Sequence, residues 1–94
     1  MANELIPIVE DNSRNLKLAR DTLQVKGYWT IEAGTGEEGV QLAREHHPAL
    51  VLMDIQLPGM SGIDPLGELR ADATTGAIPV IAVRNGTAHM DGPR

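Results

Sequence analysis

Short apolar runs alternate along the chain with stretches in which apolar residues recur every three or four positions. A short apolar run that ends abruptly is typical of a strand buried on both faces of a parallel sheet. Apolar residues at helical spacing instead indicate a helix with one polar face. The runs predict strands at residues 5–9, 28–33, 49–53 and 78–83.

Helices are expected in the three intervening stretches, and local signals mark the ends of the first two. Asn12 or Ser13 can cap a first helix, which Gly27 would end in a left-handed conformation. Thr35 followed by Glu38 three residues later predicts a capping box at the start of a second helix. The chain therefore specifies these helix ends locally.

A third, short helix is expected to begin at Ser61 or Gly62, with Pro65 in its first turn, where a missing N–H is tolerated. Residues 84–94 show no periodicity, and we predict an irregular tail there. Short connections and right-handed crossovers turn this element order into a doubly wound α/β fold, with a parallel sheet between helices. We expect a single domain over residues 1–94, with the fourth strand as an open edge.

Composition narrows the classes of function. A chain of 94 residues suffices for one small domain, and its formal charge of −5 argues against binding to a nucleic-acid backbone. The absence of cysteine excludes disulfides and thiolate metal sites. No apolar run in the sequence is long enough for a membrane helix, and we expect a cytoplasmic protein that does not act at a membrane.

Acidic residues follow two of the predicted strands. Glu10 and Asp11 come after the first strand and Asp54 after the third. Ligands of doubly wound sheets bind at the carboxyl ends of the strands, so these side chains should meet in one crevice. Carboxylates crowded together repel one another unless a cation lies among them, and Mg²⁺ prefers such oxygen ligands. The pattern indicates an acidic metal site that would suit phosphoryl transfer.

Three segments then resemble the receiver domain of two-component response regulators, and chemotaxis regulators in particular. They are IVEDN at residues 8–12, LMDIQLPGMSG at residues 52–62 and IPVIAV at residues 78–83. The middle segment is the most specific of the three. The order and separation of the segments match the family over residues 4–83.

The resemblance implies a flavodoxin-like fold and a role in signalling rather than as an enzyme. Asp54 would be the phosphoacceptor; Asp11 would bind Mg²⁺ directly, Glu10 would bind it through water, and Gln56 would contribute its backbone carbonyl. The implied partners are a sensor histidine kinase or phosphotransfer protein as donor and a downstream effector protein. The function would be phosphorelay signal transduction.

The sequence departs from the family in two places. Receivers end the fourth strand in Ser or Thr, which acts as a switch, whereas this chain has Arg84 there and Thr87 three residues later. The family also continues through another helix to a fifth strand ending in a phosphate-binding Lys, and we expect this chain to be truncated to about four strands and three helices. Lys17 and Lys26 lie in or after the first helix, so neither can be that Lys. The alternative function is therefore a phosphorylation-independent interaction or assembly module. A homodimer is expected, either through the open edge at residues 78–83 or through apolar surface, including part of the first helix, that the last helix of the family would cover.

Two motifs match those of other protein classes, a dinucleotide-binding protein and a phosphatase, but neither match is complete. Residues 34–39 match the dinucleotide-binding pattern G-x-G-x-x-G, but two glutamates would face the pyrophosphate, so a turn and capping box are the better interpretation. Asp54 also suits a haloacid-dehalogenase-type phosphatase, but such enzymes carry a second Asp two residues later, where this chain has Gln56.

Overall fold

The computed structural model describes residues 4–54, 64–84 and 87–91. Its elements, in chain order, are β1 (Leu5–Val9), α1 (Ser13–Val25), β2 (Trp29–Ala33), α2 (Gly36–His46), β3 (Val51–Asp54), α3 (Pro65–Ala71), β4 (Val80–Arg84) and β5 (Thr87–Asp91). The first seven elements follow the predicted order, with boundaries shifted by one or two residues at most strand ends. The predicted start of the third helix at Ser61 or Gly62, two residues that lie outside the described ranges, is wrong. Helix α3 begins at Pro65 with Asp64 as an extended N-cap, because proline is favoured in the first helical position.

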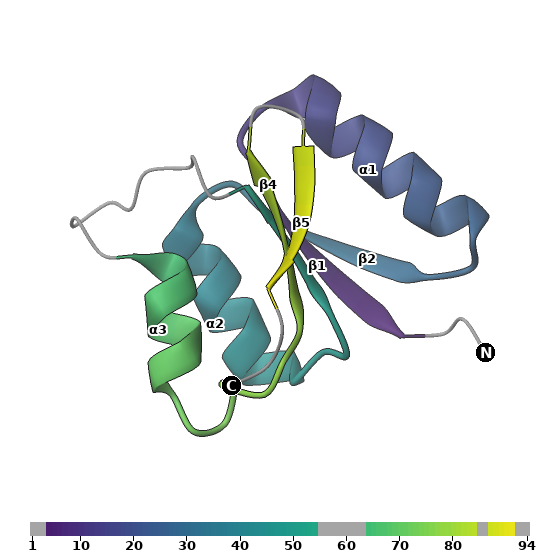
Figure 1. Ribbon diagram of the computed structural model, residues 1–94. Helices are drawn as coiled ribbons and strands as arrows, with labels where there is room; N and C mark the ends of the chain where they lie inside the picture. The colour runs from purple at the N-terminus through teal and green to yellow at the C-terminus, as the bar shows by residue number, and fades with distance from the viewer. Residues whose placement is uncertain (1–3, 55–63, 85–86, 92–94) are drawn as a thin grey trace.

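The strands form one sheet in the order β2-β1-β3-β4-β5, and the neighbours among β1 to β4 run parallel. The helices lie on both sides of this sheet, with α1 on one side and α2 and α3 on the other (Figure 1). Right-handed crossovers through helices produce this arrangement from alternating strands and helices. The predicted doubly wound architecture is therefore confirmed.

The prediction of an irregular tail beside an open fourth strand is wrong for residues 87–91. Strand β5 pairs antiparallel with β4, from Arg84 opposite Thr87 to Val80 opposite Asp91. The backbone N–H and C=O groups along an open β4 edge would lack partners, and the returning chain supplies them. The signal was present in the sequence, because Asn85-Gly86 is the dipeptide most typical of a two-residue hairpin connection.

The predicted caps of α1 and α2 are confirmed. The Asn12 side chain accepts hydrogen bonds from the backbone N–H groups of Arg14 and Asn15, at 3.0 and 3.1 Å. Gly27 has φ 91°, a conformation that glycine adopts without strain. Thr35 accepts from the Glu38 backbone N–H at 3.2 Å. These bonds satisfy backbone groups that a helix leaves without internal partners.

One face of the sheet packs into the main apolar core. A cluster of buried side chains joins β1, β2, β3 and β4 to α2 and α3, and includes Val9, Val40, Met53, Leu69 and Val80. Among the described residues, α1 contributes no buried side chain. The two faces of the sheet are therefore covered unequally.

Helix α2 approaches β1 closely because it carries a glycine at the contact. A Cβ atom placed on Gly39 would lie 2.5 Å from Val9 Cγ2, closer than van der Waals contact allows. The N-terminal part of α2, which follows the β2 strand end, is thus held directly against the strand that leads into Glu10.

In the described part of the chain, no helix is both long and apolar enough to cross a membrane.

Candidate functional site

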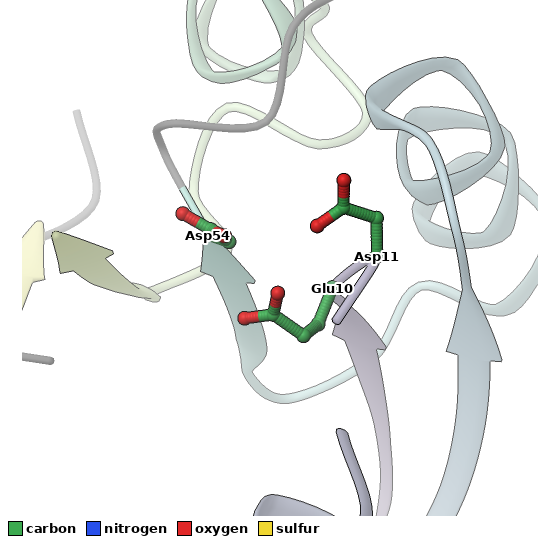
Figure 2. A group of neighbouring side chains, drawn as sticks. All are labelled: Glu10, Asp11 and Asp54. Atoms are coloured by element: carbon green, nitrogen blue, oxygen red, sulfur yellow. The ribbon is translucent and has the colours of Figure 1, made fainter. Parts of the chain in front are cut away.

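Three carboxylates meet at the carboxyl ends of β1 and β3. Each of Glu10, Asp11 and Asp54 offers an oxygen within 4.8 Å of the other two. Figure 2 shows the three side chains around a common space, with Glu10 and Asp11 following β1 and Asp54 ending β3. The register explains this, because Val9 lies opposite Met53 in the parallel pair, so the next residues on both strands are acidic.

Hydrogen bonds fix Glu10 in this crevice. Its backbone N–H donates to the Ala33 carbonyl at 2.9 Å, which extends the β1–β2 pairing by one residue. Its Oε1 accepts from the backbone N–H of Asn12 at 3.1 Å. Glu10 is 8% exposed, and Asp11 is exposed at the rim. One buried and one exposed acid thus stand beside the half-buried Asp54.

The electrostatics of the crevice favour a cation. Burial raises the pKa of the Glu10 carboxyl above its ordinary value of 4.5, the hydrogen bond from Asn12 opposes this, and the charges of Asp54 and Asp11 raise the pKa further. A divalent ion among the three carboxylates would replace this repulsion with attraction. Hard oxygen ligands in this number and spacing fit Mg²⁺, which usually keeps several of its waters.

The structure does not describe the side chains of the other predicted site residues. Gln56 lies outside the described residues, so its proposed carbonyl ligand stays a prediction. Arg84 ends β4 and pairs with Thr87 at the start of β5, one position beyond the pair formed by Asp54 and Val83. The structure describes the backbone of both residues but not their side chains, so the choice of switch residue also stays a prediction.

An apolar groove adjoins the carboxylates, in keeping with the expectation that part of the first helix is left uncovered. It encloses about 440 Å³ between α1 and the sheet, and Glu10 and Asp54 line one end. Its walls include Leu18 on α1 and Leu52 and Val83 on the sheet. The signal was indirect: Leu18 lies beside the apolar positions that define the core-facing stripe of α1.

Comparisons with known proteins identify the family. Residues 6–92 match the sequence profile of the response regulator receiver domain. The chain belongs to this family. Its membership confirms the predicted resemblance and places the chain in two-component signalling.

Relatives of this receiver domain include the polar-differentiation response regulators DivK of two Brucella species. The chain is 53% identical to DivK of Brucella ovis and 51% identical to that of Brucella anthropi, in each case over 78 residues that make up 83% of this chain. The match spans 63% of the length of each relative.

Solved structures agree with this assignment. The receiver domain of the sensor histidine kinase PA1611 from Pseudomonas aeruginosa is 30% identical, with a TM-score of 0.80 over 88% of this chain and 68% of that one. It holds a magnesium ion in its active-site cleft. A response regulator receiver protein from Methanoculleus marisnigri is 31% identical, with a TM-score of 0.78 over 86% of this chain and 66% of that one. The flavodoxin-like fold expected from the sequence is confirmed.

Proposed function

We propose that this receiver domain accepts a phosphoryl group on Asp54 from a phosphohistidine of a sensor histidine kinase or phosphotransfer protein, and that a downstream effector protein recognises the phosphorylated form. The observation that carries the proposal is the convergence of Glu10, Asp11 and Asp54 within 4.8 Å. The magnesium ion in the cleft of the PA1611 receiver domain supports a metal at the corresponding place.

In the proposed transfer, a carboxylate oxygen of Asp54 attacks the phosphorus atom of the donor. A new O–P bond forms while the N–P bond to the donor imidazole breaks, and the electron pair of the broken bond goes to the imidazole nitrogen. Asp11 would hold Mg²⁺ directly, Glu10 through a water molecule, and Gln56 through its carbonyl, as the family resemblance implies. Mg²⁺ supplies positive charge to the oxygens of the transferring group.

Residues of this chain also prepare the nucleophile. Asp54 ends a buried strand that pairs with β1 and β4 on its two sides, so its backbone cannot move away from Glu10 without breaking the sheet. The bond from the Asn12 N–H keeps the Glu10 carboxylate in the crevice. Positioning of this kind lowers the entropy cost of bringing the reacting groups together.

One observation favours the alternative function, a phosphorylation-independent interaction module. Strand β5 runs antiparallel to β4, so it ends at Asp91 opposite Val80. This is the end of the strands that lies away from Asp54. A parallel strand in this place would deliver its last residue to the carboxylates. The site as described therefore takes no cation from the end of β5, and phosphorylation would depend on another source of positive charge.

Incubation with acetyl phosphate and Mg²⁺, followed by intact mass spectrometry, separates the two functions. We expect the wild-type chain to gain one phosphoryl group that is lost on treatment with hydroxylamine, as an acyl phosphate would be. Asp54→Asn should remain unmodified, whereas Asp64→Asn is the matched control, since Asp64 lies at the start of α3 and its side chain makes no capping hydrogen bond.

The proposal fails if the wild-type chain stays unmodified under conditions in which a known receiver domain is labelled. It also fails if Asp54→Asn is labelled as fully as Asp64→Asn. In the first case the interaction module becomes the better explanation, and in the second case another residue is the acceptor.

A further inference from the structure

Asn12 connects the carboxylate crevice to helix α1 through hydrogen bonds in both directions. Its backbone N–H donates to Glu10 Oε1 at 3.1 Å, and its backbone carbonyl accepts from the Leu16 N–H at 2.9 Å. Its side-chain Oδ1 accepts from the N–H groups of Arg14 and Asn15, at 3.0 and 3.1 Å. One residue therefore holds a carboxylate of the crevice and the first turn of α1 together.

The first turn of α1 relies on these bonds because its side chains are hardly buried. Residues 12–15 are exposed, and α1 contributes no buried side chain among the described residues. Glu10, in contrast, is 8% exposed, and its backbone N–H donates to the Ala33 carbonyl at 2.9 Å. A loosely packed helix end is thus joined to a residue that the sheet holds in place.

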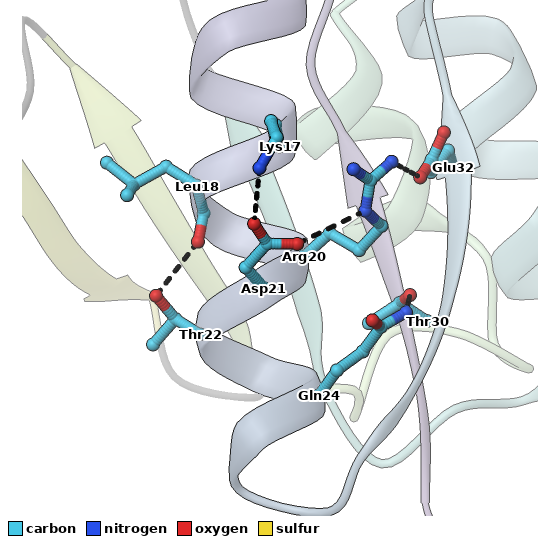
Figure 3. Close-up of polar contacts among 8 residues, drawn as sticks. All are labelled: Lys17, Leu18, Arg20, Asp21, Thr22, Gln24, Thr30 and Glu32. Atoms are coloured by element: carbon cyan, nitrogen blue, oxygen red, sulfur yellow. Dashed lines mark hydrogen bonds and ion pairs between the residues drawn. The ribbon is translucent and has the colours of Figure 1, made fainter.

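Separate contacts hold the later turns of α1. Arg20 Nη1 donates to Glu32 at 3.1 Å and Gln24 Nε2 donates to Thr30 at 3.2 Å, so two points along the helix are joined to β2 (Figure 3). Helix ends open locally at a lower cost in free energy than elements packed within the fold. The first turn can therefore order or fray while these contacts keep the rest of α1 on the sheet.

We propose that Asn12 is a positioning residue that couples Mg²⁺ binding at the three carboxylates to the order of the first turn of α1. The inference rests on the metal site of the proposed function. In the metal-free chain, repulsion between the carboxylates favours a Glu10 side chain turned out of the crevice, and the bond from the Asn12 N–H opposes this. A cation among the carboxylates would favour the same inward position of Glu10, so the cap and the ion should strengthen each other.

One effect acts in the opposite direction but is weaker. The N-terminus of α1 carries partial positive charge that the nearby carboxylates stabilise, so a cation that neutralises them favours fraying. Exposed charges at a helix end contribute less than the hydrogen bonds of a good N-cap, because salt screens them. The net coupling should therefore be favourable. Linkage makes it mutual: an ordered first turn raises the affinity for Mg²⁺, and bound Mg²⁺ orders the first turn.

Three variants of the 94-residue chain test the effect of the cap on the metal site. Asn12→Ala removes the cap, and Asn12→Ser keeps a side-chain oxygen that caps about equally well. Thr35→Ala is the matched control, since it removes the cap of α2, where Thr35 Oγ1 accepts from the Glu38 N–H at 3.2 Å. Mg²⁺ is titrated into each ¹⁵N-labelled chain while two-dimensional NMR follows the amide signals of the three acidic residues.

We expect Asn12→Ala to bind Mg²⁺ about threefold more weakly than the wild type, which corresponds to part of the stability that an N-cap supplies. Asn12→Ser and Thr35→Ala should both bind it within about 1.5-fold of the wild-type affinity, because one keeps the cap and the other loses a cap that does not bond the crevice. Well-dispersed spectra of the variants show that the fold is retained.

Amide exchange in the wild type tests the reverse effect without any substitution. Exchange of the Arg14 and Asn15 amide protons with water is measured by NMR in EDTA and in saturating Mg²⁺. The ion should slow both by about threefold, since linkage makes the two effects of similar size. The Glu38 amide proton, which bonds the cap of α2, should exchange at the same rate in both conditions. This measurement decides the question even if Asn12→Ala fails to fold.

The outcomes separate this inference from the proposed function. If Mg²⁺ shifts none of the three acidic residues in the wild type, the metal site is wrong and the inference falls with it. If the wild type binds Mg²⁺ but Asn12→Ala binds it as tightly, or Asn12→Ser as weakly as Asn12→Ala, the inference alone is overturned. An equal loss in Thr35→Ala, or exchange at Arg14 and Asn15 that Mg²⁺ leaves unchanged or accelerates, would also overturn it.

Discussion

Removing one negative charge from the carboxylate crevice should stabilise the fold in the absence of metal. Glu10, Asp11 and Asp54 lie within 4.8 Å of one another, and in Asp54→Asn two of the three repulsive pairs disappear. At 4.8 Å two unit charges repel by about 0.9 kcal/mol in water and by about 3.5 kcal/mol at an effective dielectric constant of 20. Because Asp11 is exposed and salt screens the charges, the lower value is the better guide.

We therefore expect Asp54→Asn to raise the free energy of unfolding by about 1–2 kcal/mol in EDTA at pH 7 and low salt. The assay is urea unfolding followed by far-UV circular dichroism, with linear extrapolation to water. Asp64→Asn, which makes the same chemical change outside the crevice, should change the value by less than about 0.5 kcal/mol. The gain in Asp54→Asn should largely disappear in 1 M KCl, where the screening length falls to about 3 Å.

Metal should narrow the difference in stability between the two proteins. At a Mg²⁺ concentration ten times its dissociation constant, binding to the folded chain adds about 1.4 kcal/mol. Wild-type protein should show this gain, and Asp54→Asn, with one ligand fewer, should show less of it. If Asp54→Asn is no more stable than the wild type in EDTA while Asp64→Asn behaves as expected, the carboxylates do not repel one another in the folded state and the argument from crowding is refuted.

Two further predictions concern Glu10 and the contact between α2 and β1. Between pH 4.5 and the raised pKa of Glu10, this carboxyl binds more protons in the folded chain than in the unfolded chain, so the free energy of unfolding should fall as the pH rises through this window. The measurement is urea unfolding at several pH values. If the free energy of unfolding depends on pH in Glu10→Gln as it does in the wild type, the prediction is contradicted. Gly39→Ala should lower the free energy of unfolding by about 1–2 kcal/mol, since crowding against Val9 outweighs the gain in helix propensity. Gly67→Ala, whose new Cβ would meet only the movable Asp64 side chain, should be neutral or stabilising in the same assay, and equal effects of the two changes would show that the Gly39 contact is not tight.

Much of the fold could be predicted from the sequence because its determinants are local. Asn12, Thr35 and Gly27 act on backbone groups only a few residues away, so their neighbours in the sequence suffice to recognise them. The apolar runs predict buried parallel strands for a similar reason, since each run carries its own burial pattern. The acids after two such runs could be assigned to one edge of the sheet, because parallel strands that are neighbours end on the same side.

Features that depend on contacts between segments distant in the sequence were decided by the tertiary structure. Thr87–Asp91 has no apolar run of its own, and only the preceding Asn85-Gly86 favours a hairpin in the sequence. It becomes a strand because β4 offers a row of backbone groups that need partners. The 4.8 Å spacing of the carboxylates follows from the register of β1 against β3, which no local pattern encodes. Leu18 and Leu52 look like ordinary core residues in the sequence. Their exposure in the groove follows from the packing of α1 against one flank of the sheet, because burial depends on which elements lie opposite a side chain as well as on its own polarity.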